Sequence, residues 1–86
     1  MKKHYILLTV KIPSDPKSPA EYELTKKWQL FQPAAAHKAK TNKDIVTLAE
    51  NTWLIPRDSG LPFVAECIAL ARSYNLEHNS WFLDEA

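Results

Sequence analysis

The second half of the chain, residues 44–84, is the part that most constrains the fold. Two short apolar segments, Asp44–Leu48 and Thr52–Pro56, are separated by Ala49-Glu50-Asn51. Asparagine tolerates the left-handed backbone conformation that a tight turn requires. The two segments therefore predict a β-hairpin.

A helix is expected directly after this hairpin. The hydroxyl of Ser59 can accept a hydrogen bond from a free N–H at a helix start, and Pro62 suits a first turn, where no N–H donor is needed. Asn75 is a suitable residue for the helix end. The apolar residues between these signals recur with a 3.6-residue period: Phe63, Val64, Cys67, Ile68, Leu70, Ala71 and Tyr74. A short strand, Ser80–Leu83, follows with side chains alternating between two faces, so this half predicts β-β-α-β.

The first half begins with a predicted strand, His4–Ile12. Its even-numbered residues from Ile6 to Ile12 are apolar, and its other face still carries Tyr5 and Leu7. A strand that is apolar on one face and partly apolar on the other is typical of the centre of a sheet. We therefore expect a central strand here.

A second helix is predicted from Pro19 to Phe31. The segment Ser18-Pro19-Ala20-Glu21 has the pattern of a capping box, with serine at the cap and glutamate three residues later. Leu24, Trp28 and Phe31 would then share one helical face. Residues 32–43 contain Pro33 and lack a clear apolar face, so we expect a flexible or weakly helical connection.

The predicted order is β-α-β-β-α-β in a single domain, residues 1–86. This order favours an α+β fold, the ferredoxin-like plait, with a four-stranded antiparallel sheet and two helices on one face. A chain of 86 residues buries only about 60–65% of its unfolded surface, so a partner would add useful stability. No motif assigns the chain to a known family.

Composition argues against several kinds of site. The single glycine, Gly60, excludes glycine-rich phosphate loops, and His4, His37 and His78 are too dispersed to suggest a metal site. We therefore expect neither cofactor nor metal. Cys67 is the only cysteine, so no intramolecular disulfide can form, and a cytoplasmic location is expected. The N-terminal apolar run stops at Lys11, too short for a signal peptide, and we expect no membrane segment.

The residues give little support for catalysis. Cys67 lies on the apolar side of its predicted helix, away from any evident base. Asp15, Asp44 and Asp58 fall in predicted loops or at strand starts, where they could bind a divalent ion, and a small metal-dependent nuclease is a remote alternative. Acidic loop residues more often cap helices and turns, so we do not expect an enzyme.

Charge is distributed unevenly along the chain. Residues 1–43 carry a net charge of +6 and residues 44–86 carry −5. Folding could mix these charges, or the basic half could bind an anionic partner. The alternative function is accordingly nucleic-acid binding, with tryptophans available for stacking on bases. The basic contacts would be Lys26, Lys27, Lys38, Lys40 and Lys43 in segment 26–43, with Arg57. Arg57 precedes the second predicted helix, where it could help to hold an anion or point to solvent while Asp58 and Ser59 cap the helix.

The leading hypothesis is a non-catalytic binding or regulatory module. It would act through protein–protein contacts with another protein or as a homodimer, using a sheet face or an edge strand. The expected self-association face comprises Tyr5, Leu7, Trp53 and Ile55.

Overall fold

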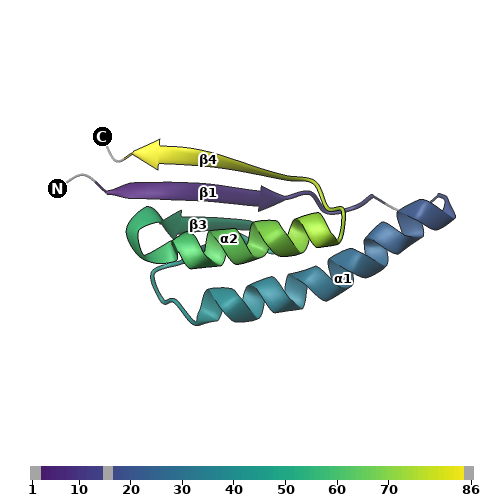
Figure 1. The fold of residues 1–86 in the computed structure, drawn as a ribbon, viewed down its shortest axis with the longest axis horizontal. Helices are drawn as coiled ribbons and strands as arrows, with labels where there is room; N and C mark the ends of the chain where they lie inside the picture. Colours follow the sequence, from purple (N-terminus) through teal and green to yellow (C-terminus); the bar gives the residue numbers. More distant parts are fainter. Residues whose placement is uncertain (1–2, 15–16, 85–86) are drawn as a thin grey trace.

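The computed structural model describes residues 3–14 and 17–84, which form an α+β fold. The elements in chain order are β1 (His4–Val10), α1 (Pro19–Lys40), β2 (Val46–Ala49), β3 (Thr52–Pro56), α2 (Arg57–Ser73) and β4 (His78–Asp84). The strands form one four-stranded sheet in the order β2-β3-β1-β4, and every neighbouring pair is antiparallel. Figure 1 labels β3, β1 and β4 of this sheet together with both helices. The predicted element order and hairpin are confirmed.

Both helices cover the same face of the sheet. The ring of Trp53 on β3 packs edge-on against Phe31 of α1 and Phe63 of α2, with centroid distances of 6.4 and 5.9 Å. Trp53 is fully buried at this junction. Contacts with two helices on one side of a strand place the hydrophobic core between the sheet and the helix layer.

Strand β1 is central, as predicted. After the exposed His4, its even-numbered residues Ile6, Leu8 and Val10 are buried against the helices, whereas Tyr5 and Leu7 are half-buried on the opposite face. This alternation follows from the two-residue period of a strand.

Helix α1 begins where the capping signal predicts. The Ser18 hydroxyl accepts a hydrogen bond from the Glu21 N–H at 3.2 Å, and Pro19 occupies the first helical position. The Glu21 carboxylate accepts a bond from the N–H of Lys17 at 2.9 Å, whereas a capping box would use the N–H of Ser18 itself. The start of α1 is thus confirmed with a modified cap.

The predicted end of this helix at Phe31 is wrong. Helix α1 continues through Pro33 to Lys40, so most of the expected flexible connection, residues 32–43, is helical. Ala35 and Ala39 are buried and extend the apolar side that Trp28 and Phe31 begin. These side chains are too small to show as an apolar stripe in the sequence, yet their size lets the helix backbone lie close to the core.

Helix α2 starts earlier than predicted, at Arg57, with Pro56 as its cap residue. Ser59 is therefore not the cap, and no side chain makes a capping hydrogen bond. Strand β3 leads directly into the helix, because the φ of Pro56, −64°, suits both the end of the strand and the entry to the helix. The expected cap at Asp58 or Ser59 is replaced by a direct strand-to-helix junction.

The end of α2 is the predicted one. Asn75 has a φ of 58°, and its N–H donates to the Arg72 carbonyl at 3.1 Å, while the N–H of Leu76 donates to Ala71 at 2.9 Å. These two bonds form a Schellman motif, which satisfies carbonyls at the helix end. Asn51 was expected to be left-handed in the β2–β3 turn, but Asn75 is the non-glycine residue with positive φ in the described part of the chain. Asn51 instead bonds to Val10 of β1 through its side chain and its carbonyl.

The charges of the two halves mix in the fold. Lys38 of α1 pairs with Glu66 of α2 at 3.0 Å, and Lys11 pairs with Glu77 at 3.6 Å. Each pair joins the basic first half to the acidic second half. The sequence-level charge separation therefore does not produce two separate charged lobes.

Candidate functional site

The predicted self-association face divides between the two sides of the sheet. Tyr5 and Leu7 lie on the side away from the helices, as that hypothesis requires. Trp53 and Ile55 are 0% exposed and lie on the helix side, so their assignment to this face is wrong. Residue 53 pairs with Leu8, whose side chain is buried, and residues opposite each other in an antiparallel pair share a face.

A row of apolar side chains crosses the sheet on the side away from the helices. Leu54 of β3 is paired with both Val46 of β2 and Leu7 of β1, and Leu7 is paired in turn with Trp81 of β4. A second row joins Pro56, Tyr5 and Leu83. We call these residues the open sheet face: Tyr5, Leu7, Val46, Leu54, Pro56, Trp81 and Leu83. All seven are uncharged, so this part of the sheet presents an apolar surface on the side away from the helices.

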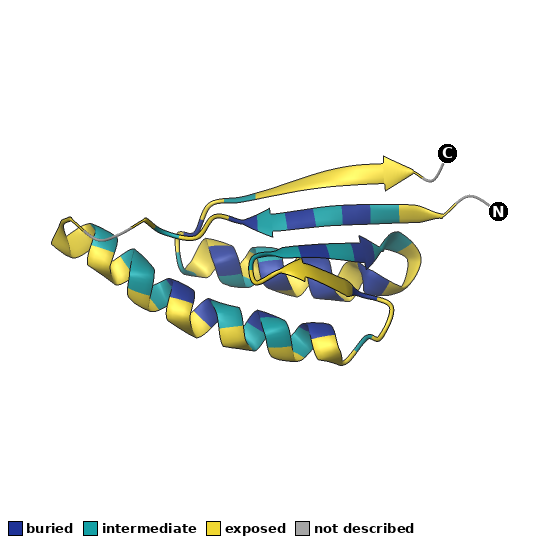
Figure 2. Ribbon diagram, turned by 180° about the vertical axis from the view of Figure 1, so that it is seen from behind, coloured by how far each residue is buried: buried dark blue, intermediate teal, exposed yellow. Residues whose placement is uncertain are grey.

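Strand β4 carries the most exposed part of this surface. Trp81, Phe82 and Leu83 are 49%, 70% and 41% exposed, and β4 is exposed along almost its whole length (Figure 2). Because side chains alternate, Phe82 points to the helix side, where the Arg57 guanidinium lies 5.4 Å from its ring centroid. The sequence signal for this surface was the uninterrupted Trp-Phe-Leu run in the last strand. These three side chains are exposed because β4 is an edge strand, and the sequence does not show which strands lie at the edges of the sheet.

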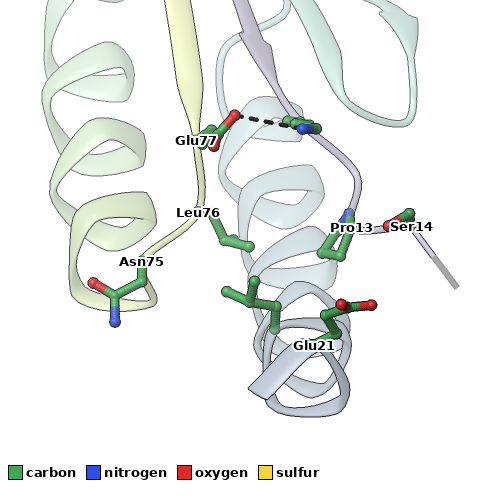
Figure 3. A pocket seen from close by; sticks show the side chains of 8 residues that line it. Pro13, Ser14, Glu21, Asn75, Leu76 and Glu77 are labelled. Atoms are coloured by element: carbon green, nitrogen blue, oxygen red, sulfur yellow. Dashed lines mark ion pairs between the residues drawn. The ribbon is translucent and has the colours of Figure 1, made fainter. Parts of the chain in front are cut away.

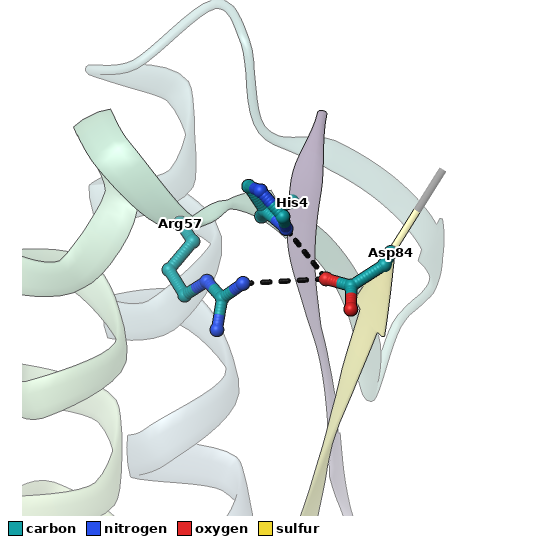
Figure 4. A network of polar contacts seen from close by, with 3 residues as sticks. All are labelled: His4, Arg57 and Asp84. Carbon is teal, nitrogen blue, oxygen red and sulfur yellow. Dashed lines mark hydrogen bonds and ion pairs between the residues drawn. The ribbon is translucent and has the colours of Figure 1, made fainter. Parts of the chain in front are cut away.

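A polar cluster lies at the end of the sheet where β1, β4 and the start of α2 meet. The Asp84 carboxylate accepts a hydrogen bond from Nδ1 of His4 at 2.5 Å, and the Arg57 guanidinium donates to the same oxygen at 3.3 Å (Figure 4). The bond from His4, supported by the positive charges of His4 and Arg57, lowers the pKa of Asp84 below its ordinary 3.8. Arg57, predicted either to hold an anion or to face solvent, is instead paired with this carboxylate.

Two surface hollows are formed by polar and apolar side chains together. One lies between the start of α1 and the end of α2, lined by Pro13, Glu21 and Leu76, with the Lys11–Glu77 pair at its rim (Figure 3). The other is beside the His4–Arg57–Asp84 cluster and includes Asp44, Asp58 and Ser59. Acidic and basic groups both line the second hollow, so it offers no uniform field for either an anion or a cation.

The basic residues of segment 26–43 separate into two sets. Lys27 lies over the Tyr74 ring, and Lys38 pairs with Glu66, so these two are engaged with α2. Lys26, Lys40 and Lys43 are exposed, and Lys26 lies over the ring of Tyr22 on its own helix. The structure therefore does not gather the predicted nucleic-acid contacts, with Arg57, into one patch.

The groups considered for catalysis and metal binding do not form a catalytic or metal site within the described residues, although Asp44 and Asp58 line the same hollow. Cys67 is buried in the core, and this burial raises the pKa of its thiol to about 12, which suppresses the nucleophilic thiolate. Among residues 3–14 and 17–84, no three His, Cys, Asp or Glu side chains come together in a way that could hold a metal ion. Asp15, one of the acids considered for a divalent ion, lies outside the described residues.

No protein-family model, curated protein or solved structure is significantly similar to the chain. Within the described part of the chain, neither helix combines the length and the apolar character that crossing a bilayer requires.

Proposed function

We propose that this chain is a ferredoxin-like plait that acts as a non-catalytic protein–protein binding module and self-associates through either its open sheet face or its edge strand β4. The order β-α-β-β-α-β and the strand order β2-β3-β1-β4 support the plait. An unpaired, buried Cys67 suits a reducing compartment such as the cytoplasm.

The observation that carries this proposal is the run Trp81-Phe82-Leu83. Three consecutive large apolar side chains are each more than 40% exposed on an edge strand, beside further apolar residues on β1 and β3. Fully burying one such side chain contributes roughly 1.5–3 kcal/mol. A second copy that covered part of this surface would therefore gain several kcal/mol, enough to offset much of the entropy lost on association.

The test is the mass of the protein in solution across a wide concentration range, by light scattering and native mass spectrometry. The wild-type protein is expected to be a dimer, and Trp81→Glu is expected to be a folded monomer, because a charge at this position would be buried without a partner. Leu30→Glu is the control, since Leu30 is another large apolar residue, 57% exposed compared with 49% for Trp81, but lies on α1. A wild-type protein that stays monomeric throughout would reject self-association.

A second candidate function rests on one face of α1. Lys26, His37 and Lys40 recur at helical spacing on the exposed side of this helix, opposite the buried Phe31 and Ala35. A basic stripe of this kind can follow a phosphate backbone, and nucleic-acid binding remains the alternative.

This alternative predicts binding that weakens steeply with added salt. Fluorescence anisotropy with a labelled single strand would measure it, and Lys26→Glu with Lys40→Glu should abolish it. Lys11→Glu is the control, because Lys11 is a lysine outside the α1 stripe, directly after the end of β1 at Val10. Binding that is unchanged by the double substitution would reject the basic stripe as the contact.

A further inference from the structure

Strand β4 presents a free backbone edge. The Lys11 N–H donates a hydrogen bond of 2.8 Å to the Glu77 carbonyl. In an antiparallel pair the backbone groups of successive residues point to alternate sides of the strand, so this bond shows which residues of β4 bond to β1. The bond from the Val10 N–H to the Asn51 carbonyl agrees, because it shows that the even-numbered residues of β1 bond toward β3 and leave the odd-numbered ones to bond to β4. The odd-numbered residues of β4 therefore bond to β1. The even-numbered residues, His78, Ser80, Phe82 and Asp84, direct their N–H and C=O groups away from the sheet.

The two edges of the sheet differ in their protection. Strand β2 has four residues, and its pairing with β3 is interrupted by an irregularity between Thr47 and Ala49. Short length and bulges are devices by which edge strands avoid pairing with other chains. Strand β4 has seven residues in regular register with β1, contains neither proline nor lysine, and is strongly apolar at its centre. Its edge thus lacks the devices that β2 has.

We propose that β4 pairs antiparallel with β4 of a second copy, about a two-fold axis at Trp81. This inference rests on the proposed function, and it specifies that the second copy joins at the strand edge instead of stacking on the open sheet face. Ser80 would pair with the partner's Phe82, and His78 with the partner's Asp84. The result is one continuous eight-stranded sheet.

The register follows from the ladder phase. Only even-numbered residues have outward backbone groups, so a symmetric pairing must be centred on a residue, and Ser80, Trp81 and Phe82 are the centres that pair the most outward residues. Centring on Trp81 uses all four outward residues of each strand and forms about eight hydrogen bonds. Centring on Ser80 would place Asp84 opposite the partner's Leu76, which lies outside β4. Centring on Phe82 would leave His78 unpaired, because it would extend beyond the partner's Asp84.

The side chains agree with this register. His78 and Asp84 lie on the same face of β4, so the pairing brings an imidazole beside a carboxylate at each end of the interface. The two Trp81 side chains meet at the two-fold axis in a non-hydrogen-bonded pair, where cross-strand side chains approach most closely. The open sheet faces of the two copies become one apolar surface, which a further protein could cover.

A backbone substitution tests the pairing. Ser80→Pro removes an outward N–H that makes no bond to β1, and proline is tolerated on an edge strand where the N–H faces solvent. We expect a folded monomer for Ser80→Pro and a dimer for Ser80→Ala, which keeps the N–H. Leu7→Glu should remain a dimer, because Leu7 lies on the sheet face and not at the β4 edge. Circular dichroism and light scattering measure fold and mass.

Disulfide trapping tests the register independently, including the case in which Ser80→Pro does not fold. Trp81→Cys should crosslink rapidly into a covalent dimer on mild oxidation, because the two β-carbons are close at the two-fold axis. Ser80→Cys and Phe82→Cys should crosslink much more slowly, and the wild-type protein with its buried Cys67 is the background control.

The outcomes separate the two proposals. A dimer that survives Ser80→Pro but is lost in Leu7→Glu would reject edge pairing and leave self-association through the open sheet face. Faster crosslinking at position 80 or 82 than at 81 would overturn the register. A wild-type protein that is monomeric at all concentrations would reject both the pairing and the proposed function.

Discussion

Gly60 of α2 lies so close to Ile55 of β3 that a β-carbon at position 60 would overlap Cγ2 of Ile55. The only glycine of the chain is therefore required for contact and not for a turn, because it has no positive φ. It lets the first turn of α2 pack directly on the strand that precedes it.

Gly60→Ala is predicted to destabilise the fold by about 1–2 kcal/mol. Overpacking typically costs roughly 1–3 kcal/mol, and alanine's higher helix propensity returns up to about 1 kcal/mol of this. Chemical denaturation measures the change, with Ser59→Ala, at an exposed neighbouring position, as the control. In an Ile55→Leu background, which lacks Cγ2, the cost of Gly60→Ala should fall. An equal cost in both backgrounds would contradict the overlap as its cause.

Asn75→Ala should lower the free energy of unfolding by about 1 kcal/mol, because alanine is disfavoured at the observed φ of 58°. Asn75→Gly should be close to neutral, since glycine adopts this conformation without steric strain. Thermal or urea unfolding of the two variants provides the comparison. Equal destabilisation by alanine and glycine would show that the asparagine side chain, and not the backbone conformation, matters here.

His4→Ala should raise the pKa of Asp84 toward its ordinary 3.8, because it removes the hydrogen bond that lowers it. A carboxyl group whose pKa is lower in the folded state than in the unfolded state stabilises the fold at pH values above the unfolded-state pKa. This contribution is lost as the pH falls through the folded-state pKa. Acid unfolding of the wild-type protein should therefore show this loss below about pH 4, and His4→Ala should show a smaller loss, because Arg57 still pairs with Asp84. NMR titration of the carboxyl carbon measures the pKa, with Lys11→Ala as the control. An Asp84 pKa that does not change in His4→Ala would contradict the assignment.

Cys67 should react with thiol reagents only when the fold opens. Its thiol is buried, and its pKa of about 12 leaves almost no thiolate at pH 8. Labelling of the native protein should be at least about 100-fold slower than labelling in denaturant, because opening of a core helix is rare. Ser73→Cys places a second thiol at an exposed position of α2 as the control and should label rapidly. Comparable native rates at positions 67 and 73 would contradict a protected core.

Local signals predicted most of the elements, and they failed where packing determined the outcome. Ser18 and Pro19 correctly placed the start of α1, and Asn75 placed the end of α2, because capping depends on a few neighbouring residues. The sequence did not predict the extension of α1 to Lys40, because alanines such as Ala35 and Ala39 contribute to burial only where the core lies close to the helix backbone. The start of α2 was displaced because the junction at Pro56 and the contact at Gly60 depend on β3.

The sequence by itself determined the order of strands and helices, the alternation within β1 and the apolar composition of Trp81-Phe82-Leu83. Each is a property of residues that are close along the chain. Only the tertiary structure decided that Trp53 and Ile55 are buried while Leu54 is on the open sheet face, and that β4 is an edge strand. A strand's alternation defines two faces but not which one the helices cover, and its neighbours are set by long-range pairing. The interaction surface proposed for this protein depends on those two choices.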